Sequence, residues 1–145
     1  PLGECGITFF AAPPLAAPYR ERFPGPLKDA PMLVPAESTA LRGALMHWLD
    51  QLGIRPQIVG EFEDRALMQA FGQAGVGVFM SPSVIDAEVA RQHGVEPIGS
   101  TTAVRERYYA ISTERRLRHP AVVAVSHAAR LEVFAGCAGT AATSG

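Results

Sequence analysis

Three acidic side chains stand close together near the middle of the chain, at Glu61, Glu63 and Asp64. They follow the β-branched pair Ile58 and Val59, so a predicted strand ends where they begin and a predicted helix starts just after them. One interpretation is structural, because carboxylates stabilise the start of a helix by about 0.3–1 kcal/mol each. The other is chemical, because carboxylate oxygens suit a hard cation or a polar ligand. The residue types alone leave both interpretations open.

Other patterns that carry chemistry in proteins are weak or missing in the sequence. Gly72, Gly75 and Gly77 spell GxxGxG, but they follow a predicted helix and precede a predicted strand, which is the reverse of a dinucleotide or phosphate loop. We therefore expect a structural turn there. No GxSxG pattern marks a nucleophilic serine, and Cys5 falls inside a predicted strand, where we expect a small buried hydrophobe. HExxH and CxxC patterns are also missing, so we predict no transition-metal site at the histidines His47, His93, His119 and His127.

The charge balance and composition limit the classes of protein that fit. A net charge of −1 and a pI near 6.5 give no basic field that would attract nucleic acid. The hydrophobic share of 48% allows a buried core within a single domain. No apolar run reaches the roughly 18 residues of a membrane span, and one pair of cysteines is no disulfide framework. We therefore expect a cytoplasmic protein. A basic cluster is expected to be a solvated loop, with nucleic-acid contact as the alternative: Arg115, Arg116, Arg118 and His119.

A strand–helix–strand unit would position the acidic trio. The helical pattern after the trio predicts one buried stripe, formed by Leu67, Ala70, Phe71 and Ala74. Residues 78–80 then predict a buried strand. Strands joined by a helix in this way are expected to be parallel neighbours, within a parallel βαβαβ core over residues 32–80.

The clearest helix in the sequence precedes this unit. Ser38 or Thr39 supplies its N-cap, and Gly53 stands at the position where a left-handed residue ends a helix. Its buried face is predicted to hold Leu41, Leu45, Trp48, Leu49 and Leu52.

The remaining segments complete an α/β fold, a mostly parallel sheet with flanking helices. Strands are predicted at 5–10, 32–34, 95–98 and 105–113, and helices at 81–94 and 119–134. The proline-rich segments 11–18 and 23–31 are expected to be irregular, and the tail 135–145 disordered. Ligands of such sheets bind beyond the carboxyl ends of the strands, which here are residues 35–38, 61–64 and 81–83.

Several segments resemble, in order and spacing, the effector-binding domain of LysR-type transcriptional regulators. They read CGITFFAAPPLA, GEFEDRALMQAFGQAGVGVFMSP and RERYYAISTERRLRHPAVVAVSHAAR. The resemblance implies a two-lobed fold like that of type II periplasmic binding proteins, of which residues 1–134 would be a part. The second lobe would span about 13–104, strands 5–10 and 105–113 would cross between the lobes, and helix 119–134 would return to the first lobe. The winged helix-turn-helix of the family and the first half of the first lobe are absent from this sequence.

The family resemblance also implies a function. Its effector lies between the lobes, so the candidate effector-binding residues are Pro13, Pro14, Ser38, Glu61, Phe62, Glu63 and Asp64. Within the family, the sequences of these segments are most similar to those of regulators that activate a sodium–proton antiporter gene in response to sodium. Sodium is thus an expected effector with the acidic trio as possible ligands, and no other cofactor is expected.

The resemblance describes a regulator rather than an enzyme. Its expected partners are a small-molecule or ion effector, further copies in a homodimer or homotetramer, and DNA only through the absent N-terminal domain; no membrane contact is expected. An effector that binds one arrangement of lobes more tightly would shift the population toward it. The alternative is a solute-binding lobe of a periplasmic-type binding protein.

Overall fold

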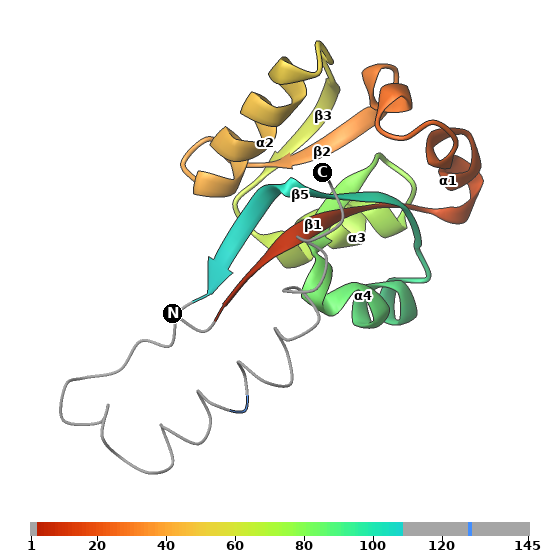
Figure 1. Ribbon diagram of the computed structural model, residues 1–145. Helices are drawn as coiled ribbons and strands as arrows, with labels where there is room; N and C mark the ends of the chain where they lie inside the picture. The colour runs from red at the N-terminus through yellow and green to blue at the C-terminus, as the bar shows by residue number, and fades with distance from the viewer. Residues whose placement is uncertain (1–2, 109–127, 129–145) are drawn as a thin grey trace, which may run out of the picture.

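The computed structural model describes residues 3–108 and residue 128 (Figure 1). The predicted helix 119–134, the basic cluster at 115–119, the end of strand 105–113 and the tail 135–145 lie outside the described residues, apart from Ala128. The strands are β1 (Gly3–Ala11), β2 (Pro31–Pro35), β3 (Gln57–Phe62), β4 (Phe79–Pro82) and β5 (Glu96–Tyr108). The helices are α1 (Pro13–Arg20), α2 (Ala40–Gln51), α3 (Arg65–Gln73) and α4 (Asp86–His93), with 3-10 turns η1 (Gly25–Lys28) and η2 (Ser83–Ile85).

The strands form a mixed sheet in two parts that meet at Val78. β2 and β3 are parallel, whereas β1 pairs antiparallel with β4 on one side and β5 on the other. Val78 makes a parallel bridge to Met32, with Val78 N donating to Pro31 O and Leu33 N donating to Val78 O, each at 2.8 Å. The prediction that β3 and the strand of 78–80 are neighbours is therefore wrong, since β2 lies between them. The predicted mostly parallel sheet is likewise a mixed one.

The long antiparallel pair β1 and β5 runs through the centre of the structure (Figure 1). The register places Glu4 opposite Arg107 and Cys5 opposite Glu106, which confirms the predicted pairing of strand 5–10 with strand 105–113 as far as residue 108. β5 is one continuous strand rather than the two predicted, because shifts of register let it follow β1 without a break. Cys5 is buried, as expected.

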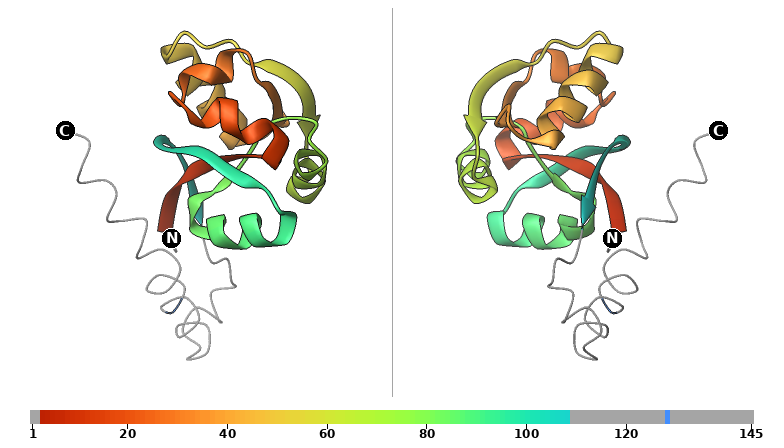
Figure 2. Two further views of the ribbon diagram at one scale, coloured as in Figure 1. Left: turned by 90° about the vertical axis from the view of Figure 1, so that its right-hand side faces the viewer. Right: turned by 90° about the vertical axis from the view of Figure 1, so that its left-hand side faces the viewer.

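Helices cover both faces of this pair. α1 and α2 lie on one side of β1 and β5 and α4 on the other (Figures 1 and 2). Phe9 stacks on Trp48 of α2, with ring centroids 5.7 Å apart, and Phe10 stacks on Phe79. Thr39 caps α2 by accepting from Arg42 N, which confirms one of the two predicted caps. Of the predicted inner face of α2, only Leu52 is exposed.

Helix α3 buries a different face from the one that was predicted. Leu67 and Phe71 of the predicted buried stripe are 50% and 43% exposed, whereas Met68 and Gly72 are buried. Gly72 explains the orientation, because a Cβ atom at this position would overlap the ring of Phe79. The helix thus approaches the core through its smallest residue and leaves its largest apolar side chains beside the edge strand β3.

Two proline-rich segments are more regular than predicted. Pro13 and Pro14 begin α1, where the missing N–H costs no helical hydrogen bond, and Pro18 lies inside that helix. The segment 23–31 contains η1. α4 begins at Asp86 instead of residue 81, because Ser81 and Pro82 pair with β1 as part of β4. In the part of the chain that is described, no helix is long and apolar enough to cross a membrane.

Candidate functional site: a pocket at the strand ends

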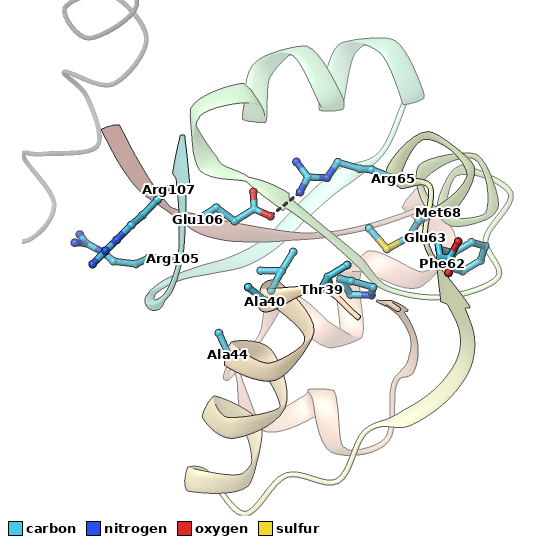
Figure 3. Close-up of a pocket in the computed structure, with 12 residues that line it drawn as sticks. Thr39, Ala40, Ala44, Phe62, Glu63, Arg65, Met68, Arg105, Glu106 and Arg107 are labelled. Carbon is cyan, nitrogen blue, oxygen red and sulfur yellow. Dashed lines mark hydrogen bonds and ion pairs between the residues drawn. The ribbon is translucent and has the colours of Figure 1, made fainter. Parts of the chain in front are cut away.

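A pocket of about 650 Å³ opens where β2 and β3 end and where α2 and α3 begin, with β5 as its far wall (Figure 3). This is the position at which ligands of α/β sheets bind. The lining residues come from all five elements and the loops beside them: Pro35, Thr39, Ala40, Leu41, Ala44, Phe62, Glu63, Arg65, Met68, Arg105, Glu106 and Arg107.

Helix α2 supplies a wall of small and apolar side chains. Ala40 and Ala44 are one turn apart on the same face, so their small side chains leave room for a ligand. Thr39 closes the first turn through its side chain, and the first N–H groups of the helix lie at the pocket. Leu41 and Met68 add apolar surface from two different helices.

The buried guanidinium of Arg42 fixes the two strand ends. Its Nη1 donates to Pro35 O at 3.0 Å, and Nη1 and Nη2 both donate to Glu61 Oε1 at 3.2 Å. The side chain of Arg42 is 11% exposed and that of Glu61 is 50% exposed. Glu61 is therefore engaged in an ion pair and does not line the pocket.

The structure assigns different roles to the members of the acidic trio. Asp64 Oδ1 accepts from Ala66 N at 2.8 Å, which confirms the structural interpretation for this residue as a helix cap. Glu63 lines the pocket next to Phe62, whose ring lies 5.3 Å from that of Phe71. Among the described residues, no three or more histidine, cysteine or acidic side chains form a group that could hold a metal ion.

The β5 wall carries most of the charge. Glu106 faces the interior of the pocket and accepts from Arg65 Nη2 at 2.6 Å, while Arg105 and Arg107 point to the other side of the strand (Figure 3). Both of these arginines donate to Glu4 of β1, and the hydrogen bond from Arg107 is the main cause of a lowered pKa of Glu4. The Arg65–Glu106 pair therefore ties α3 to β5 across the pocket.

The sequence predicted only part of this site. Phe62 and Glu63 line the pocket as candidates, but Pro13, Pro14 and Ser38 are exposed and do not line it. The alternation of charged residues at 105–107 was a signal for the β5 wall, but without the pairing partner it did not reveal which side chain faces inward. Arg65, Ala40 and Ala44 carried no signal of their own.

Comparisons with known proteins identify sequences and structures that are similar to this chain. A sequence profile described as LysR substrate binding domain matches residues 1–132. The transcriptional activator protein NhaR of Escherichia coli (strain K12) is 36% identical over 121 residues, which are 83% of this chain and 39% of NhaR. The chain thus spans well under half the length of that relative.

Solved structures share the fold at low sequence identity. The effector domain of the transcriptional regulator AmpR of Pseudomonas aeruginosa is similar with a TM-score of 0.59 at 19% identity, covering 97% of this chain and 66% of that one. The effector binding domain of QuiR in complex with shikimate is similar with a TM-score of 0.57 at 15% identity, covering 92% and 63%. These similarities confirm the predicted fold class.

Proposed function

Because the chain belongs to the LysR substrate-binding domain family, we propose that it senses an effector within a DNA-binding transcriptional activator. The family match favours this function over a solute-binding lobe of a periplasmic-type binding protein, which would have the same architecture. The proposal assigns no catalysis to the chain. DNA binding would belong to a separate N-terminal domain of the full-length protein, which would act in the cytoplasm as a homodimer or homotetramer.

The pocket at the ends of β2 and β3 is the observation that carries the proposal. It combines apolar surface from Leu41, Phe62 and Met68 with the carboxylate of Glu63 and the Arg65–Glu106 ion pair. A small organic molecule with polar groups fits such a lining, since apolar walls bury the ligand body and a few polar groups orient it. Phe62 and Glu63 are therefore the effector-binding residues that we retain from the sequence.

The position of β5 suggests how binding would be transmitted. Glu106 faces the pocket from a strand that pairs along its length with β1. A ligand that binds more tightly to one arrangement of these strands shifts the population toward that arrangement by its difference in affinity. Sodium is a second proposed input, supported by the similarity to NhaR and not by any cluster of acidic residues in the pocket.

The test uses the full-length protein and promoter DNA. The protein is incubated with a panel of small organic acids, amines and amino acids, and binding is measured by calorimetry alongside transcription from the promoter in vitro. We expect at least one compound that binds to change transcription severalfold. If compounds bind but none changes transcription or DNA occupancy, the regulatory function is contradicted.

A further inference from the structure

The charged side chains that line the pocket are unevenly paired. There are five of them: Glu63, Arg65, Arg105, Glu106 and Arg107. Arg65 donates to Glu106 at 2.6 Å, and both Arg105 and Arg107 donate to Glu4 of β1. Glu63, in contrast, forms no ion pair with any residue that the structure describes. Its charge is therefore not compensated by a described partner.

The charges that face the interior of the pocket sum to a single negative one. Figure 3 shows Glu106 directed toward Arg65, with Arg105 and Arg107 on the other side of the strand. The Arg65–Glu106 pair is neutral as a whole, so the formal negative charge of Glu63 remains. A ligand that complements this part of the lining carries a positive charge.

A negatively charged ligand fits the same lining less well. Its partner would be Arg65, but Arg65 already binds Glu106, whose side chain is only 14% exposed. An anion would have to displace that carboxylate, and taking a partner away from a largely buried charge is costly. The start of α2 favours an anion, but its partial positive charge amounts to about half an elementary charge. A cation binds at Glu63 without breaking an ion pair between described residues.

We propose that the pocket binds a small organic amine, with its ammonium group at Glu63 and its apolar body against Leu41, Phe62 and Met68. This inference rests on the proposed function and names the chemical class of the ligand. Primary amines are protonated at neutral pH, as the lysine side chain is. The ring of Phe62, which lines the pocket beside Glu63, offers an aromatic face that attracts cations. A volume of about 650 Å³ is ample for such a molecule.

The test compares amines with acids and alcohols of the same carbon skeleton on the full-length protein. Calorimetry at neutral pH and constant ionic strength measures the Kd of hexylamine, hexanoate and hexanol, and of benzylamine, benzoate and benzyl alcohol. We expect each amine to bind about tenfold or more tightly than its acid and its alcohol, the factor that one hydrogen bond to a charged group contributes. Acids that bind as tightly as the amines, or no binding of either amine, would overturn the proposal.

Two variants of Glu63 show whether this carboxylate is the group that selects the amine. Glu63→Gln should remove the preference for amines over alcohols, and Glu63→Lys should reverse it in favour of the acids. Glu37→Gln is the matched control and should keep the preference, since Glu37 is an exposed carboxylate close to the end of β2 that does not line the pocket. A preference for amines that persists in Glu63→Gln would overturn the proposal.

The same compounds separate this inference from the proposed function when transcription is measured beside binding. Transcription that responds to the acids alone would overturn the amine assignment and leave effector sensing intact. Amine binding that depends on Glu63 but leaves transcription and DNA occupancy unchanged would support the amine site and contradict the regulatory function alone.

Discussion

Arg42 holds Glu61 through two hydrogen bonds to a single carboxylate oxygen, Oε1, each 3.2 Å long. The same guanidinium donates to Pro35 O, so one buried side chain on α2 fixes the ends of both β2 and β3. The pocket lies directly beyond these ends, between Pro35 and Phe62. The shape of the pocket therefore depends on the ion pair between Arg42 and Glu61, although neither of these residues lines the pocket.

Replacing Arg42 should cost more stability than replacing its partner. Arg42→Met leaves the buried carbonyl of Pro35 without its donor, and we expect the free energy of unfolding to fall by about 1–3 kcal/mol. Glu61→Gln should cost less than about 1 kcal/mol, because Glu61 is half-exposed and such pairs are weak. Urea unfolding measures both, with Arg91→Met in the exposed pair with Glu88 as control. A loss for Arg42→Met no larger than the control would contradict the role of Arg42.

The approach of α3 to the core can be tested at Gly72. We expect Gly72→Ala to lower the free energy of unfolding by about 1–3 kcal/mol, because the added methyl group overlaps the ring of Phe79. Gly43→Ala is the matched control in a helix, since nothing lies within 4 Å of a Cβ at that position and alanine is the better helix former by about 0.5–1 kcal/mol. Thermal or urea unfolding should show opposite signs for the two variants. A neutral Gly72→Ala would mean that α3 packs differently.

Asp86 predicts a pH dependence whose direction is fixed by its raised pKa. A carboxyl whose pKa is higher in the folded state than its ordinary value of 3.8 favours folding most when protonated, and this contribution is lost as the pH rises through the raised value. Asp86→Asn should therefore gain stability relative to wild type as the pH increases across that window. Urea unfolding at several pH values measures the difference. A constant difference across the window would contradict the burial of this carboxyl.

The contrast between α2 and α3 shows how far the sequence could predict the fold. In α2, the periodicity, the Thr39 cap and Gly53 with its φ of 70° all agree, and the predicted helix is observed. In α3, the pattern correctly identifies an amphipathic helix but not the face that is buried, because a glycine packs where an apolar stripe was expected. Hydrophobic periodicity shows that two faces differ, and only the partner surface decides which of them it covers.

The candidate site was predictable only where a local rule applied. The carboxyl ends of the strands gave its position, and Phe62 and Glu63 followed from it. The far wall of the pocket comes from β5, more than 30 residues further along the chain, and a single sequence holds no record of that pairing. The pairing of Glu61 with Arg42 is likewise a tertiary contact, so the sequence alone could not show that this candidate carboxylate is engaged in an ion pair.

The most direct test of the account fills the pocket without changing the rest of the domain. Ala44 lines the pocket from α2, whereas His47, one turn further along the same helix, is exposed and does not line the pocket. In the full-length regulator we predict that Ala44→Trp still binds promoter DNA but no longer responds to the organic compounds that change transcription by wild-type protein. His47→Trp should respond as wild type does. An undiminished response in Ala44→Trp would contradict the assignment of this pocket as the effector site.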